Sequence, residues 1–141
     1  MKTQRGITLA SLVIYVIALT VVVGVISVLV TFFNHNITNM NNTAEVNLEL
    51  NKFEAQMIQE TQISGNRIEK CDNNAKTLTF TSGNTYIFQD NKIYLNTIEI
   101  TNNVESFDVR QEKDGDKQLL KISIHIKKGQ IEVSKNLSYV M

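Results

Sequence analysis

The first third of the chain is a long apolar run. Residues 7–33 include no charged side chain. At a rise of about 1.5 Å per residue, a helix over these residues is about 40 Å long, more than the ~30 Å hydrocarbon core of a bilayer requires. The pattern therefore predicts a membrane-spanning helix over 7–33.

The next residues keep a helical period but become amphipathic. Residues 34–44 are polar and rich in asparagine, and the apolar positions after them recur at i, i+4, i+7 and i+11. This spacing predicts that the helix continues over 34–64 with one buried face. The apolar residues of that face are Val46, Leu50, Phe53 and Met57. Glu45, Glu49, Lys52 and Glu60 are expected to lie largely off it.

The period changes from helical to two after Gly65, a residue suited to the left-handed end of a helix. Short alternating segments then follow one another, separated by turn residues such as Asn, Asp and Gly. Because the connections are short, sequential antiparallel pairing is expected. Strands are predicted over 68–71, 77–81, 85–89, 92–95, 97–100, 104–110, 118–127 and 130–140.

These elements predict an α+β fold: a long N-terminal helix with a C-terminal antiparallel sheet, residues 65–141, packed on its second half. In the clearest strand, Leu120, Ile122, Ile124 and Ile126 alternate with polar residues, so one face should be buried and the other exposed. A head of this size is small for an independent core. We therefore expect the second half of the helix to complete that core.

Charge is balanced over the chain but uneven at its start. The sequence has 14 basic and 14 acidic side chains, and Lys2 and Arg5 precede the apolar run. Basic residues on the short side of a spanning helix keep that side cytoplasmic, which predicts the N-terminus inside and the C-terminus outside. Cys71 is the only cysteine, so an intrachain disulfide and a cysteine metal cage are excluded.

The apolar run opens on Gly6-Ile7-Thr8-Leu9 directly after a six-residue basic leader. In this respect the chain resembles the type IV pilin and type II secretion pseudopilin superfamily. The resemblance implies cleavage after Gly6 by a prepilin peptidase, a new N-terminus at Ile7 that the family usually methylates, and Thr8 and Leu9 in the family's Phe-Thr-Leu opening. Residues 1–6 would then be a leader.

One position departs from that pattern. Ser11 stands where the family normally has a glutamate that pairs with the N-terminal amine of a neighbouring subunit, and a hydroxyl cannot replace that charge. The resemblance therefore implies a minor rather than a fibre-building subunit. The strand pattern of the head, with a late Val-Glu-Ser-Phe-Asp-Val segment, is similar to the J-type minor pseudopilins.

Small residues recur along one face of the apolar helix, and such stripes let helices approach closely in membranes. The stripe is interpreted either as a face for packing against other pilin helices or as ordinary tolerance of small residues in a spanning segment. Its members are Thr20, Gly24, Ser27 and Thr31.

Candidate chemistry is sparse. Phosphate-binding glycine motifs and zinc spacings do not occur, and the two histidines, His35 and His125, are far apart, with His125 expected on an exposed strand face. Asp114-Gly115-Asp116 with Glu112 lacks the further ligands of a calcium loop and is interpreted as a hairpin turn. No catalytic residue, cofactor or metal site is predicted.

Lysines make the C-terminal third locally basic, which raises a DNA-binding or adhesive pilin as an alternative, although aromatic residues are few and glutamates are close by. A solvated sheet face is the favoured interpretation of this charge. The six residues are Lys113, Lys117, Lys121, Lys127, Lys128 and Lys135.

With no catalytic motif found, the resemblance implies a non-enzymatic minor pilin or pseudopilin. It would sit in the cytoplasmic membrane as a precursor, with prepilin peptidase and other pilin subunits as partners, and would then join a cell-surface or periplasmic fibre of a pilus, secretion or competence system. The other alternative is an unprocessed single-pass anchor with an extracellular β-rich module.

Overall fold

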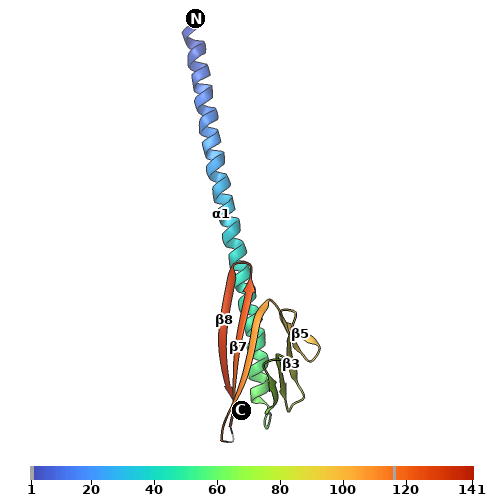
Figure 1. The fold of residues 1–141 in the computed structure, drawn as a ribbon. Helices are drawn as coiled ribbons and strands as arrows, with labels where there is room; N and C mark the ends of the chain where they lie inside the picture. Colours follow the sequence, from blue (N-terminus) through green and yellow to red (C-terminus); the bar gives the residue numbers. More distant parts are fainter. Residues whose placement is uncertain (1, 116) are drawn as a thin grey trace. The chain divides into compact units, whose positions relative to one another are not determined.

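The fold was analysed in a computed structural model, which describes residues 2–115 and 117–141, with side chains described for residues 8–113, 115 and 117–141. The chain divides into two compact units, Met1–Thr38 and Asn39–Met141. The first unit is helical, and the second contains the C-terminal part of the same helix and two β-sheets (Figure 1). The predicted α+β class is confirmed.

A single helix, α1, runs over Lys2–Gln62. The sequence has no proline, so no missing N–H interrupts the helical hydrogen bonds. Its last turn closes through a hydrogen bond from Ile63 N to Glu60 O at 3.4 Å, and Gly65 takes a φ of 78°. The left-handed residue turns the chain away from the helix axis, as the sequence predicted.

The strands form two antiparallel meanders rather than one continuous sheet. The first has five strands in the order β1-β2-β3-β4-β5, and the second has three in the order β6-β7-β8. All eight predicted strands are present, within a few residues of the predicted ends. Their bounds are β1 Ile68–Asp72, β2 Thr77–Phe80, β3 Thr85–Gln89, β4 Lys92–Leu95, β5 Ile98–Thr101, β6 Val104–Asp114, β7 Lys117–Lys128 and β8 Ile131–Val140.

The break between the sheets lies at Asn102 and Asn103, and Asn103 has a φ of 58°. After this turn β6 pairs with β7 instead of β5. Asn102 N donates a hydrogen bond to Glu49 Oε2 on α1 at 3.0 Å, and the Thr101 hydroxyl donates to Glu49 O at 3.4 Å. The helix therefore holds the junction between the two sheets.

Both sheets share one core with the C-terminal part of α1. Val46, Leu50, Phe53 and Met57 are all buried, which confirms the predicted helical face. The Phe53 ring packs edge-to-face on Tyr86 of the first sheet, with ring centroids 6.4 Å apart, and on Phe107 of the second, at 5.9 Å. Such aromatic pairs add to the stabilisation that comes from burial of their area.

Two glutamates depart from the predicted pattern. Glu49 and Glu60 were expected off the buried face, yet only 5% and 3% of their surfaces are exposed. They follow Val46 and Met57 by three residues, so the helix brings them onto the same face as the apolar residues. Glu60 accepts hydrogen bonds from the strands and loops of the head, and Glu49 accepts one from Asn102 of the head and one from Lys52 of α1.

Candidate functional site

The apolar part of α1 is a candidate interaction surface because large apolar side chains point outward all around it. Among the described residues, one helix, Thr8–Gln62, is long and apolar enough to cross a membrane. Large apolar side chains between Leu9 and Phe33 expose between 49% and 74% of their surfaces. The helix is therefore suited to lipid or to an apolar partner, and is consistent with a single-pass membrane anchor.

Three hydroxyl side chains of this segment donate hydrogen bonds within the helix. The hydroxyls of Thr20, Ser27 and Thr31 donate to the carbonyls of residues four positions earlier, at 2.8, 2.9 and 3.0 Å. A hydroxyl bonded in this way adds little cost to burial in lipid. With Gly24, whose missing Cβ would meet nothing within 4 Å, they form the small-residue face that the sequence indicated.

Not all residues of the processing prediction are described. Lys2, Arg5, Gly6 and Ile7 lie outside the residues whose side chains the structure describes. Thr8, Leu9 and Ser11 are exposed on α1.

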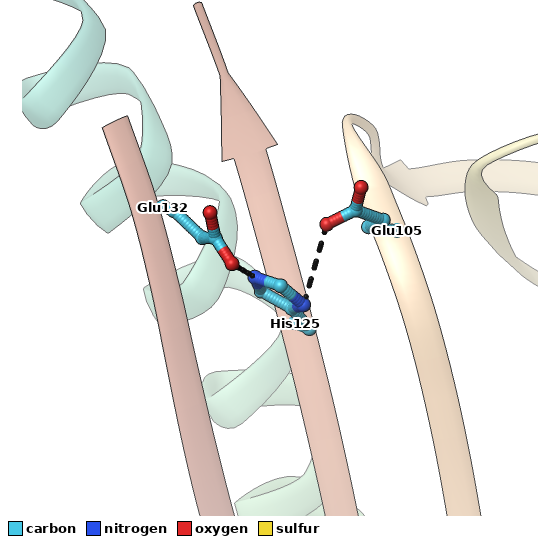
Figure 2. Close-up of side chains that lie close together, drawn as sticks. All are labelled: Glu105, His125 and Glu132. Carbon is cyan, nitrogen blue, oxygen red and sulfur yellow. Dashed lines mark ion pairs between the residues drawn. The ribbon is translucent and has the colours of Figure 1, made fainter. Parts of the chain in front are cut away.

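A cluster of one histidine and two glutamates lies on the outer face of the second sheet. His125 is on β7, between Glu105 of β6 and Glu132 of β8 (Figure 2). His125 Nε2 lies 2.8 Å from Glu132 Oε1, and His125 Nδ1 lies 3.4 Å from Glu105 Oε2. The sequence placed His125 on an exposed face, but only 21% of its side chain is exposed, because the two glutamates flank it.

A β-bulge positions the first of these glutamates. Val104 pairs with Ile126 and Ser106 pairs with His125, so Glu105 is the extra residue between two consecutive pairs. A bulge of this kind re-aims a side chain without ending the strand. Glu105 is thereby brought beside His125, although the strict alternation of β6 would not place it there.

Lys127 lies at the edge of the same cluster. Its Nζ is 3.8 Å from Glu105 Oε1 and 3.8 Å from Glu132 Oε2. Two carboxylates therefore face one lysine and one histidine. The far oxygen of each glutamate is turned toward the lysine, and the near oxygen is turned toward the imidazole.

A polar cleft of about 480 Å³ adjoins the cluster and shares Glu105 and Lys127 with it. Its charged residues are mixed in sign, and Lys128 forms an ion pair with Glu45 of α1 across it. Among the described residues that line it there is no serine, cysteine or histidine to act as a nucleophile or a general base. Its lining is Glu45, Asp90, Asn91, Lys92, Asn102, Asn103, Glu105, Lys127 and Lys128.

The C-terminal lysines do not form an unopposed basic patch. Lys121 pairs with Glu112 at 2.7 Å, and Lys135 pairs with Glu54 at 2.6 Å. Lys127 and Lys128 have the glutamate partners described above. Four of the six lysines that suggested a contact with DNA are therefore already paired with carboxylates. In the segment interpreted as a hairpin turn rather than a calcium loop, the side chains of Asp114 and Asp116 lie outside the described residues.

Cys71 is a half-buried residue of β1. Burial, and secondarily the Asp72 carboxylate beside it, raise the pKa of its thiol. A raised pKa lowers the fraction of reactive thiolate, so the structure favours a packing role for this residue.

Sequence reasoning missed two features of the head: the His125 cluster and the buried hydrogen-bond network around Glu60. The sequence did contain a signal for the network: Glu60 follows Phe53 by seven residues, or two helical turns, so both lie on the same buried face of the helix. For the cluster there was none, because Glu105, His125 and Glu132 come together only through strand register and a bulge.

Comparisons of the chain with protein-family models, with curated proteins and with solved structures found no match.

Proposed function

We propose that the chain is a minor pilin or pseudopilin, cleaved after Gly6 and assembled through its apolar helix into a type IV pilus or a related secretion or competence fibre. Its role would be structural, with no bond of a substrate made or broken. Its partners would be other pilin-like subunits, prepilin peptidase and the membrane.

The observation that carries the proposal is the contrast between the two parts of α1. The first part exposes apolar side chains in all directions, whereas the part after Asn39 buries one face under two antiparallel sheets. A helix with this distribution is suited to lipid at one stage and to an apolar bundle of like helices at another. Transfer between the two would not require exposure of the apolar surface to water.

The small-residue face supports the assembly step. The surface around Ser27, Val28, Thr31 and Phe32 forms a shallow apolar recess. Close approach of two helices is favoured where side chains are small and hydroxyls are satisfied internally. This face would contact neighbouring subunits in the fibre.

The same helix would equally serve an unprocessed single-pass anchor, so processing is the decisive test. The full chain would be produced in cells with prepilin peptidase and in matched cells without it, extracted from membranes and measured by intact-mass spectrometry. We expect loss of residues 1–6 only where the peptidase is present. A chain that keeps Met1–Gly6 in peptidase-containing cells would refute the proposal in favour of the anchor.

Two substitutions sharpen this test. Gly6→Ala is expected to block cleavage while leaving membrane insertion intact, because the spanning segment is unchanged. Gly24→Ala is the matched control, since it makes the same change elsewhere in the apolar helix, where a Cβ meets nothing within 4 Å. The control is expected to be cleaved like the unmodified chain.

A further inference from the structure

We propose that Glu105, His125 and Glu132 bind one divalent transition-metal cation, represented by Zn²⁺, on the outer face of the second sheet. The three residues offer one imidazole nitrogen and two carboxylate oxygens. Nitrogen and oxygen donors of these types are ligands of Zn²⁺ in proteins, and three protein ligands leave a coordination position open. The proposal goes beyond the structural role above and does not depend on it.

The distances bring the three side chains within reach of one cation, although Glu132 lies against Nε2 and Glu105 lies 3.4 Å from the other ring nitrogen, Nδ1. The ligand atoms of the three residues all lie within 4.8 Å of one another, and His125 Nε2 is 2.8 Å from Glu132 Oε1. Two ligands bound to one metal at about 2.0–2.2 Å in tetrahedral geometry are themselves about 3.4 Å apart, so the 2.8 Å pair would open slightly on binding. Glu105 has 47% of its side chain exposed, so it has room to move the remaining distance by a change of rotamer.

The histidine nitrogen supplies an independent observation. His125 Nε2 is buried and makes no hydrogen bond to any residue that the structure describes, even though a carboxylate oxygen is only 2.8 Å away. The in-plane direction of Nε2 thus misses the oxygen at a distance where a well-aligned bond would be strong. In the tautomer that carries its proton on Nδ1, Nε2 has a lone pair, and such a buried nitrogen beside two carboxylates is suited to a metal ion.

The three ligands also come from a rigid framework. β6, β7 and β8 are adjacent strands, paired on both sides of the bulge at Glu105, and Figure 2 shows His125 between the two glutamates on the side of the sheet turned away from α1. Binding sites on strands are held more precisely than sites on loops. The inner face of the same strands is fixed by the buried Ile124 and Ile126.

Lys127 would compete with a metal ion for the carboxylates of Glu105 and Glu132. Its Nζ lies 3.8 Å from one oxygen of each glutamate. A positive charge at this distance weakens the binding of a second cation to the same carboxylates. Replacement of Lys127 by a neutral residue should therefore increase the affinity for the metal. If the cluster is only a set of ion pairs and binds no metal, the same replacement would remove one ion-pair partner and produce no gain in metal binding.

The test uses the full chain in detergent, treated with a chelator and then titrated with ZnCl₂ by calorimetry. Co²⁺ would serve as a second probe, through its visible absorption. We expect one Zn²⁺ per chain. His125→Gln should weaken binding by more than about tenfold. In metal sites generally, loss of a residue that only hydrogen-bonds to a ligand already costs about that much affinity, so loss of a ligand should cost more. Lys127→Gln should bind Zn²⁺ several-fold more tightly.

Two controls separate this site from other zinc binding. His35→Gln removes the only other histidine, and Glu112→Gln removes a carboxylate from the same sheet, where it pairs with Lys121. Both should keep the affinity of the unmodified chain. The proposal is overturned if that chain shows no saturable one-to-one binding, if His125→Gln binds equally tightly, or if either control loses as much affinity. Should circular dichroism show His125→Gln unfolded, Glu132→Gln carries the same expectation and the same refutation.

Discussion

The hydroxyl of Tyr86 on β3 donates a hydrogen bond to Glu60 Oε1 on α1 at 3.3 Å, and both side chains are buried. The second oxygen of Glu60 accepts from Asn66 Nδ2 at 2.8 Å and from the Ser82 hydroxyl at 3.0 Å. Asn84 Nδ2 also donates to Oε1. A single acceptor group therefore ties the end of α1 to the chain after it and to the β2–β3 hairpin.

Glu60→Gln should destabilise the head. The amide would place an N–H donor where two donors already converge, leaving buried polar groups unpaired at a cost of about 1–3 kcal/mol. The measurement is denaturant unfolding of the full chain in detergent, followed by the β-sheet signal in circular dichroism. Glu69→Gln is the matched control, because Glu69 is exposed on β1 and its substitution should change stability little. Equal stability of the two variants would show that the network contributes nothing.

Tyr139, unlike Glu60, has a buried polar atom without a hydrogen bond in the described part of the chain. Its hydroxyl oxygen is buried and has no hydrogen-bond partner among the described residues. Tyr139→Phe removes this unsatisfied group and keeps the ring, so stability at neutral pH should be unchanged or slightly higher. Tyr94→Phe is the control for loss of a phenol elsewhere in the head. A loss of stability above about 1 kcal/mol in Tyr139→Phe would show that the hydroxyl is satisfied after all.

The same residue predicts an alkaline loss of stability. Burial, with a smaller contribution from the Glu54 carboxylate, raises the pKa of Tyr139 to about 12 from a usual value of 10.0. The folded chain holds the Tyr139 proton more tightly than the unfolded chain does. The stability that this difference contributes is therefore complete below pH 10 and is lost as pH rises to about 12. In unfolding measured across this range, Tyr139→Phe should show a shallower decline than Tyr94→Phe. Identical slopes would contradict the assignment.

The coarse architecture followed from sequence because it depends on local patterns. Val46, Leu50, Phe53 and Met57 lie on one helical stripe, and Gly65 marks the change to strands. The turns also matched local chemistry: Asp90 and Asn91 both have positive φ between β3 and β4, as a two-residue hairpin turn requires. Helix, strands and the buried helical face were therefore predictable.

The features that the sequence did not predict depend on contacts between residues that are distant in the chain. Glu60 looked like a surface residue because glutamate is seldom buried, and its donors Ser82 and Asn84 are supplied by a hairpin more than twenty residues away. The division into two sheets falls at the turn of Asn102 and Asn103, where Asn102 N donates a hydrogen bond to Glu49 on the helix. The cluster around His125 depends on a bulge, which shifts strand register without a clear sequence signal.

Gly129 should resist substitution for two separable reasons. It has a φ of 61° in the β7–β8 turn, and a Cβ there would lie 2.9 Å from Asn42 Nδ2. Gly115 has the same φ but nothing within 4 Å of a Cβ, so Gly115→Ala is the control for backbone strain alone. Gly129→Ala should cost about 1 kcal/mol, and more than Gly115→Ala by the steric contribution. Unfolding free energies measure both, and equal costs would remove the role of Asn42.

Gly24 tests the proposed assembly face. Gly24→Leu should leave insertion and the head unchanged, because space around Gly24 is open in the single chain and leucine is a good helix former. It should reduce assembly with neighbouring subunits, since a large side chain blocks close helix approach. Val22→Leu is the matched control, two residues away and therefore on another side of the helix. The measurement is the share of the protein recovered in sheared surface fibres or in cross-linked multimers. If Gly24→Leu and Val22→Leu assemble equally well, the small-residue face is not the surface through which the helices pack.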